Sequence, residues 1–237
     1  MTKVDFSLIL ACYNEGPTFT KSLDKIFDVL KGLKINWEVV FVEDKSTDNT
    51  REVLNKYVGG RKNCTIVLHA KNQGRGRAVA DGILKSRGKI CGFMDVDCEI
   101  SPTYLPVFIS EIKDGSEMAI ATRYYDVHLR SIVRVLASRV YSLLMRLVLN
   151  LPFKDTEAGF KFFKRDAALS LINRAHDHGW FWDTEICAIA DHDRMKITQV
   201  PVLFVKMSNK KSTVHVVSDS WDYALKLWQF RKKYKNL

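Results

Sequence analysis

The stretch Gly88-Lys89-Ile90-Cys91-Gly92-Phe93-Met94-Asp95-Val96-Asp97-Cys98-Glu99 decides the fold prediction. Its apolar run has no helical period and is preceded by a glycine, which is typical of a buried parallel strand. Carboxylates follow where that strand should end, and open α/β sheets bind ligands at the carboxyl ends of their strands. In extended chain Asp95, Asp97 and Glu99 share one face, so they could hold a hard divalent cation together with phosphates. The alternative interpretation is a solvated acidic turn.

The rest of the chain alternates strand and helix patterns, with a repeat of about 25 residues, as a mostly parallel α/β sheet requires. A single large domain fits this length. Apolar β-rich runs are expected as strands at 6–12, 37–42, 65–68, 118–121 and 195–205, and helical spacing at 23–30, 50–57, 78–87 and 165–173.

Polar side chains recur where these strands end. Asn14-Glu15 follows the first strand, Glu43-Asp44 follows the second, and Asp95 follows the fourth. The carboxyl ends of parallel strands lie along one edge of a sheet, so these groups favour a nucleotide-binding cleft there. A single carboxylate in such a place is more often a helix cap, which is the alternative for each group alone.

A glycine-containing loop, Asn72-Gln73-Gly74-Arg75-Gly76-Arg77-Ala78, precedes one of the expected helices. Val79 stands where a dinucleotide fingerprint would have its third glycine, so the loop is not that motif. Glycines before a helix let backbone N–H groups approach a phosphate, and Arg75 and Arg77 add positive charge. An ordinary loop with a helix cap remains the alternative.

Composition limits the classes of partner and compartment. The 237 residues carry a formal net charge of +10, which favours an anionic partner such as a phosphorylated ligand, an acidic membrane surface or nucleic acid. Nucleic acid is disfavoured because the positive charge is not concentrated beside RNA-type aromatic motifs. The 5 cysteines show no C-x-x-C pair, and neither a secretory signal nor a membrane span is visible, so a cytoplasmic location is expected.

The segment 130–150 combines arginines with apolar residues at helical spacing. Arg134 and Arg139 fall on its polar side, as in a helix that lies in a membrane interface. The alternative is a helix packed on the core with a solvated basic face. A second basic helix is expected near the C-terminus, at 221–234.

Two later segments, 155–163 and 179–185, place aromatic residues beside carboxylates. Rings can stack on the C–H faces of a sugar while carboxylates accept hydrogen bonds from its hydroxyl groups. The same composition also occurs in ordinary core-and-cap sequence, and both interpretations stay open.

Taken in order, these motifs resemble the family-2 glycosyltransferases, and among them the dolichyl- or polyprenyl-phosphate hexosyltransferases. The resemblance implies a nucleotide-diphospho-sugar transferase domain of the GT-A, Rossmann-like type across 1–237, with a nucleotide-sugar-binding half at 1–125 and an acceptor-binding half at 126–237. Ala121 replaces the glycine of the family's Gly-Ser-Arg element, and Lys211-Ser212-Thr213 departs from its closing Gly-Ser-Lys. The matching stretches are Tyr13-Asn14-Glu15, 43–50, 72–78, Asp95-Val96-Asp97, 122–124, 155–163 and 182–185.

The resemblance also assigns roles to residues. It implies Mg²⁺ or Mn²⁺ on Asp95, Asp97 and Glu99, which stands where the mannose synthases have a glutamine that joins the metal. Donor-binding residues would be Tyr13, Asn14, Glu15, Glu43, Asp44, Asn72, Gly74, Arg75, Arg77, Asp95 and Val96. Acceptor-binding residues would be Arg123, Arg134, Arg139, Lys211 and Ser212, and the catalytic candidates are Asp97, Arg123, Asp155 and Asp183.

The implied reaction is a metal-dependent, inverting transfer of a hexose from a nucleoside-diphosphate sugar to a polyprenyl phosphate, by a protein peripherally bound to the cytoplasmic face of a membrane. An ionised phosphate acceptor needs no general base, whereas a sugar hydroxyl does, with Asp155 and Asp183 as candidates. A hydroxyl-acceptor enzyme of cell-surface polysaccharide synthesis is therefore the first alternative, and a non-catalytic nucleotide-binding protein the second. The sugar, the nucleotide, the lipid length and the oligomeric state are left open.

Overall fold

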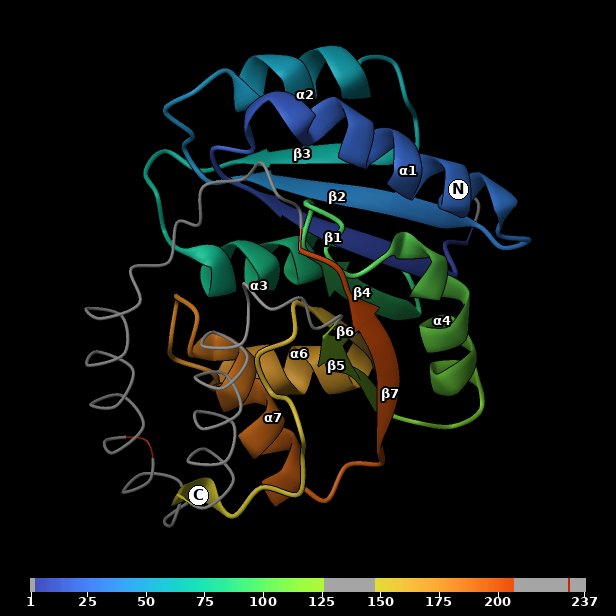
Figure 1. The fold of residues 1–237 in the computed structure, drawn as a ribbon, viewed down its shortest axis with the longest axis vertical. Coiled ribbons are helices and arrows are strands. Elements are labelled where there is room, and N and C mark those ends of the chain that lie inside the picture. The colour runs from blue at the N-terminus through green and yellow to red at the C-terminus, as the bar shows by residue number, and fades with distance from the viewer. Residues whose placement is uncertain (1–2, 126–147, 207–229, 231–237) are drawn as a thin grey trace.

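A seven-stranded sheet in the order β3-β2-β1-β4-β6-β5-β7 forms the centre of the molecule (Figure 1). The computed structural model describes residues 3–125, 148–206 and 230. The strands are β1 (Phe6–Cys12), β2 (Trp37–Glu43), β3 (Cys64–Leu68), β4 (Ile90–Met94), β5 (Met118–Tyr125), β6 (Phe160–Lys164) and β7 (Ile197–Phe204).

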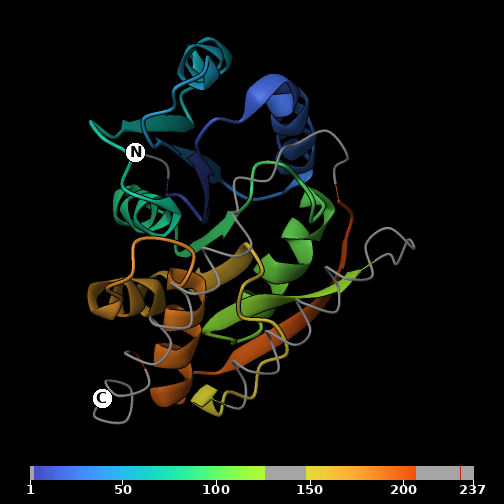
Figure 2. The ribbon, with the colours of Figure 1, turned by 60° about the vertical axis from the view of Figure 1, so that its left-hand side comes forward.

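Helices cover both faces of the sheet, as Figure 2 shows. Their apolar stripes and the alternating side chains of the strands form two hydrophobic clusters, one on each face. On one face lie α1 (Phe19–Gly32), α2 (Thr50–Val58) and α4 (Leu105–Lys113), and on the other α3 (Arg75–Lys85), α6 (Arg165–Arg174) and α7 (Trp182–His192). Short 3-10 helices at Gly16–Thr18 and Pro102–Tyr104 lead into α1 and α4.

All described strands except β6 run in the same sense. β1 pairs in parallel with β2 and β4, and β5 pairs in parallel with β7. β6 lies antiparallel between β4 and β5, so its first residue reaches the edge where its neighbours end. The prediction of a mostly parallel sheet is confirmed, and this edge collects the strand ends that the sequence singled out.

The sequence predicted six of the seven described strands, with β1, β2, β3 and β7 within two residues of their observed bounds, but it missed β6 and the helices α4 and α7. In the run Phe160–Lys164 a buried lysine, Lys161, interrupts the apolar residues that are typical of a buried strand. The first strand was predicted at its observed bounds, whereas β5 continues to Tyr125, beyond the expected end at 121.

Part of the predicted acceptor region lies outside the described residues. This holds for Arg134, Arg139, Lys211 and Ser212, for nearly all of the helix expected at 130–150, and for the C-terminal helix apart from Phe230. Across the described ranges, we find no helix that is both long enough and apolar enough to cross a bilayer.

Candidate active site

The loops after β1 and β2 are held together by hydrogen bonds. The side-chain oxygen Oδ1 of Asn14 accepts a hydrogen bond of 2.8 Å from the backbone N–H of Thr47. The N–H of Asn14 donates to Oγ of Ser46 at 3.1 Å, and the N–H of Glu15 donates to Oγ1 of Thr50 at 2.8 Å. Asn14 adopts φ 51°, a left-handed conformation that asparagine tolerates better than most residues. The two predicted donor-binding segments therefore lie side by side.

Asp44, at the end of β2, fixes the glycine-containing loop. Its buried carboxylate accepts hydrogen bonds from the N–H groups of Gln73 at 2.8 Å and Gly74 at 2.9 Å. Its backbone carbonyl accepts from Nδ2 of Asn72 at 3.2 Å. Gly74 has φ 94°, and a Cβ there would lie 2.4 Å from the carbonyl oxygen of His178, so glycine is required. These loop N–H groups, expected to face a phosphate, instead hold Asp44.

His69, directly after β3, connects this loop to α3. Its Nδ1 lies 2.6 Å from Oδ1 of Asp44, and its Nε2 lies 3.2 Å from Oδ2 of Asp81. Asp81 in turn pairs with Arg77 at 2.9 Å, four residues earlier on α3. The predicted donor-binding residue Arg77 thus belongs to a chain of polar contacts that runs through Asp81 and His69 to Asp44.

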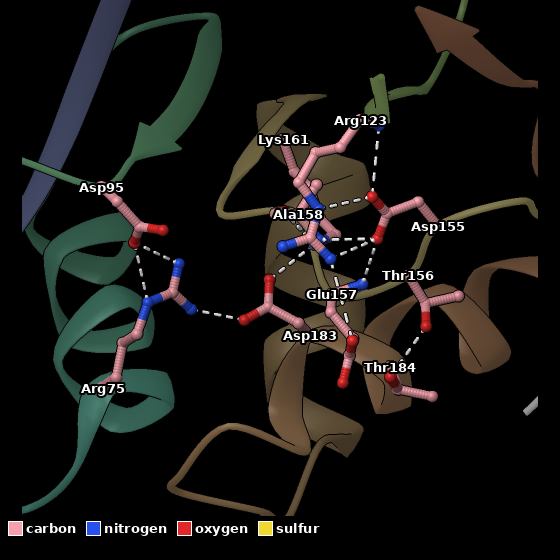
Figure 3. A network of polar contacts seen from close by, with 10 residues as sticks. All are labelled: Arg75, Asp95, Arg123, Asp155, Thr156, Glu157, Ala158, Lys161, Asp183 and Thr184. Atoms are coloured by element: carbon pink, nitrogen blue, oxygen red, sulfur yellow. Dashed lines mark hydrogen bonds and ion pairs between the residues drawn. The ribbon is translucent and has the colours of Figure 1, made fainter. Parts of the chain in front are cut away.

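Arg75 links the ends of β4 and α7 (Figure 3). Its Nε and one terminal nitrogen donate to Oδ1 of Asp95 at 2.9 and 2.7 Å, and its other terminal nitrogen pairs with Asp183. The guanidinium lies 5.4 Å from the ring centre of Phe93 and 5.2 Å from that of Trp180. Burial alone would lower the pKa of Arg75, but Asp183 and Asp95 raise it above its ordinary value, so Arg75 stays charged.

Asp183 has a second cationic partner, Lys161 of β6. The Lys161 side chain is completely buried, and its Nζ donates hydrogen bonds of 2.6 Å to Oδ1 of Asp183 and to the carbonyl oxygen of Ala158. Next to them the hydroxyl groups of Thr156 and Thr184 lie 2.9 Å apart. The loop before β6 is therefore fastened to the first turn of α7 (Figure 3).

Arg123 and Asp155 form a bidentate pair at the end of β5. Nε of Arg123 donates to Oδ2 of Asp155 at 2.6 Å, and a terminal nitrogen donates to Oδ1 at 3.0 Å. The N–H groups of Glu157 and Ala158 also donate to Asp155, at 3.1 and 3.2 Å. Burial raises the pKa of Asp155, but the Arg123 charge outweighs burial and holds it below its ordinary value. Asp155 is therefore an ionised anchor for Arg123 and for the loop.

The segment from Asp95 to Glu99 does not continue as a strand. Val96 and Asp97 form a turn, and Cys98 takes φ 56°. The N–H of Glu99 donates to Oδ1 of Asp97 at 3.2 Å, as in an Asx turn. The expectation that Asp95, Asp97 and Glu99 share one face of extended chain is wrong, because this turn ends the alternation.

A divalent cation still fits part of this turn. Over the described residues, no group of three histidine, cysteine or carboxylate side chains is arranged to hold a metal ion. Mg²⁺, however, is commonly bound through one or two carboxylates together with substrate phosphates. Asp95 and Asp97 offer such hard oxygen atoms in one turn, and the Asp95 side chain is 43% exposed.

Several of the predicted site residues therefore come together around Arg75. Asp95 and Asp183 contact it directly, and Asp44 holds Gly74 beside it. The Arg123–Asp155 pair is connected to this group through the loop 155–159, whose Ala158 N–H donates to Asp155. Glu43 supports the β2 loop through a 2.6 Å hydrogen bond from the N–H of Ser46, while Tyr13 is partly exposed and Val96 is buried.

Sequence reasoning missed Lys161, His69 and Glu157. A lone lysine between phenylalanines was a usable signal, because a buried ammonium requires an anionic partner. His69 directly follows a strand, as the other site groups do. Nothing local in the sequence distinguishes Glu157 from an exposed loop carboxylate.

Comparison with known families and proteins gives a consistent result. The family model described as Glycosyl transferase family 2 matches residues 7–171. The dolichyl-phosphate beta-glucosyltransferase ALG5D of Trichomonas vaginalis is 25% identical over 253 residues, covering 98% of this chain and 77% of that protein. The dolichyl-phosphate beta-glucosyltransferase of Saccharomyces cerevisiae is 28% identical over 240 residues, covering 91% of this chain and 71% of that protein.

Solved structures show the same fold. The glucosyl-3-phosphoglycerate synthase of Mycobacterium tuberculosis, crystallised with Mn²⁺, uridine diphosphate and glucosyl-3-phosphoglycerate, superposes with a TM-score of 0.72. The alignment covers 96% of this chain and 80% of that one at 18% sequence identity. The architecture of the sheet and its flanking helices is therefore that of the GT-A glycosyltransferases.

Proposed function

The chain belongs to glycosyltransferase family 2, and from this we propose that it moves a hexose from a nucleoside diphosphate to a polyprenyl phosphate, with inversion at the anomeric carbon. The names of the relatives in T. vaginalis and S. cerevisiae support a lipid-phosphate acceptor and favour glucose as the hexose. The acceptor also suggests a peripheral position at the cytoplasmic face of a membrane.

The observation that carries the donor half of this proposal is the Arg75 network. Arg75 lies between Asp95 of β4 and Asp183 of α7, at the sheet edge where nucleotides bind in open α/β folds. A diphosphate entering beside Asp95 would meet this permanently charged guanidinium, whose planar fork matches phosphate oxygens. We assign the donor to the edge formed by the loops after β1, β2 and β4, within residues 1–125.

The metal part of the proposal rests on the chemistry of the same turn. Asp95 and Asp97 would hold Mg²⁺ or Mn²⁺, with Glu99 as the third proposed ligand. A divalent cation there would neutralise the charge that develops on the leaving diphosphate. Arg75 would then exchange part of its contact with Asp95 for contact with the diphosphate.

Arg123 is our candidate for the acceptor phosphate. Asp155 holds the guanidinium through Nε and one terminal nitrogen, which leaves further N–H groups to donate to an anion. Its pKa lies above the ordinary value because Asp155 outweighs the effect of burial, so it is charged at every working pH. A rigid, charged fork at the end of β5 suits phosphate better than a sugar hydroxyl.

The hydroxyl-acceptor alternative needs a general base, and the two predicted candidates are poorly placed for that role. Asp155 is tied to Arg123, and Asp183 is tied to Arg75 and Lys161. The pKa of Asp155 lies below its ordinary value because of Arg123, which makes it a weak proton acceptor, and Asp183 already has two cationic partners. A phosphate acceptor avoids the requirement, because it is ionised near neutral pH.

The proposal is tested by a transfer assay with Mn²⁺ and a short-chain polyprenyl phosphate, with lipid-linked product measured by mass spectrometry. UDP-glucose, GDP-mannose and UDP-N-acetylglucosamine are offered separately, and we expect a metal-dependent glycosyl phospholipid from UDP-glucose. Arg123→Lys should raise the KM for the lipid phosphate more than the KM for the donor. Arg174→Lys is the matched control, because Arg174 pairs with Asp193 near the end of α6, away from the proposed site. Donor binding without any glycosyl phospholipid would contradict the proposed acceptor.

A further inference from the structure

Of the carboxylates of Asp155, Glu157 and Asp183, that of Glu157 makes the longest contact with a cationic side chain. Asp155 and Asp183 each accept short contacts from cationic side chains, as described above. Oε2 of Glu157, by contrast, lies 3.7 Å from a terminal nitrogen of Arg123, which exceeds hydrogen-bond length. Its side chain is 28% exposed and lies beside the Arg123 guanidinium (Figure 3).

The charged groups around Glu157 come from several elements. Arg123 belongs to β5, Asp155 to the same loop as Glu157, Lys161 to β6 and Asp183 to α7. Burial raises the pKa of Glu157 to about 7, and the charges of Asp155 and Asp183 act in the same direction against Arg123 and Lys161. A pKa in this range lets a bound anion shift the protonation of Glu157 near neutral pH.

We propose that Glu157 takes up a proton when the acceptor phosphate binds and then donates a hydrogen bond to that phosphate beside Arg123. The inference rests on the proposed function, because it assumes an anionic acceptor at Arg123. An ionised carboxylate only accepts hydrogen bonds and repels a phosphate, whereas a protonated one carries an O–H donor. The approaching negative charge itself favours protonation, so binding and proton uptake are coupled.

The proton comes from solvent and returns to it after transfer. The acceptor is a phosphate monoester that carries close to two negative charges, and the glycosylated product is a diester with a single charge. The product therefore repels the Glu157 carboxylate less than the acceptor does. Loss of the proton from Glu157 then removes the hydrogen bond to the product and restores the unliganded state.

This coupling predicts how acceptor affinity depends on pH. Acceptor binding that requires protonated Glu157 weakens as pH rises through about 7. At pH 8 the acceptor affinity should be about tenfold lower than at low pH. Glu157→Gln carries an amide N–H₂ donor at every pH and mimics the protonated form. The acceptor's own ionisation, near pH 6, affects both enzymes equally and cancels in their ratio.

The experiment compares the KM for short-chain polyprenyl phosphate in wild type and Glu157→Gln between about pH 6.5 and pH 8.5, at saturating UDP-glucose and Mn²⁺. We expect the ratio of wild-type to variant KM to be close to one at the low end and to rise about tenfold by pH 8. Titration calorimetry in two buffers of different ionisation enthalpy should show more protons taken up per acceptor by the wild type. Glu52→Gln, an exposed position on α2, is the matched control and should follow the wild type.

Two results would overturn the inference. One is a KM ratio that does not change with pH, and the other is a Gln variant that binds acceptor more weakly than wild type throughout. Formation of a glycosyl phospholipid by the wild type stands independently of both results, so either one removes only the role of Glu157. Absence of this product and of acceptor binding at every pH would remove the proposed function as well.

Discussion

Nζ of Lys161 lies 2.6 Å from Oδ1 of Asp183, and the two side chains are 0% and 2% exposed. The pair joins β6, an internal strand, to the first turn of α7. Arg75 reaches the other oxygen of the same carboxylate from α3. Asp183 thereby connects β6 and α7 to the first turn of α3, next to the proposed donor site.

Lys161→Met should destabilise the protein by about 3–5 kcal/mol, because it leaves a buried carboxylate with one cationic partner fewer. Lys164→Met, at an exposed position of the same strand, should change stability by no more than about 0.5 kcal/mol. Urea unfolding followed by circular dichroism measures both variants. Equal effects of the two substitutions would show that the buried pair does not stabilise the fold.

The sequence was sufficient to predict six of the seven described strands, because burial on both faces leaves continuous apolar runs, as in β1, β2 and β4. It also predicted that Glu43-Asp44 and Asp95 would reach the same edge, since the ends of parallel strands share an edge. Both expectations needed only local composition and the alternation of strands and helices.

The details of the site depend on pairings that no local pattern contains. Arg75 and Asp183 are 108 positions apart, and nothing near either residue specifies the other. The turn after Asp95 depends on Gly159, whose carbonyl oxygen accepts a 3.0 Å hydrogen bond from the Asp95 N–H. Local alternation therefore predicted extended chain where a tertiary contact and a turn decide the geometry.

His69→Phe should weaken the donor site while leaving the acceptor site unchanged. Phenylalanine fits a similar volume but removes the 2.6 Å contact to Asp44, whose carboxylate holds the loop N–H groups. Loss of this buried contact should lower stability by about 1–3 kcal/mol and raise the donor KM more than the acceptor KM. His192→Phe, at the exposed end of α7, is the control. A selective rise in the acceptor KM would contradict the positioning role of His69.

The Arg123–Asp155 pair predicts a specific dependence of stability on pH. Because the folded pKa of Asp155 lies below its unfolded value of about 3.9, the pair stabilises the protein above that pH. The contribution is lost as pH falls through the folded pKa. The difference in unfolding free energy between wild type and Asp155→Asn should be about 3–5 kcal/mol at pH 7 and decrease on acidification. A difference that is the same at about pH 3 and pH 7 would show that ionisation of Asp155 is not its source.

Activity should be sensitive to replacement of Gly159 by alanine, the smallest side chain that carries a Cβ. A Cβ at this position would lie 1.9 Å from Oδ2 of Asp95 and 2.6 Å from a terminal nitrogen of Arg75. Gly159→Ala should therefore displace the Asp95 carboxylate and reduce kcat/KM by about 10²–10³-fold, the usual cost of losing one preorganised electrostatic contact. The concentration of Mn²⁺ needed for half-maximal activity should also increase, because Asp95 is a proposed metal ligand.

Gly32→Ala separates this effect from a general intolerance of alanine. A Cβ at Gly32, the last residue of α1, meets no atom within 4 Å, so activity and stability should stay close to those of the wild type. Gly159 has no positive φ, and its alanine variant should therefore fold, which thermal unfolding checks. If Gly159→Ala keeps both the kcat/KM and the Mn²⁺ requirement of the wild type, the position of Asp95 beside Arg75 does not matter for transfer. In that case the metal ligands must be sought elsewhere than in the turn after β4.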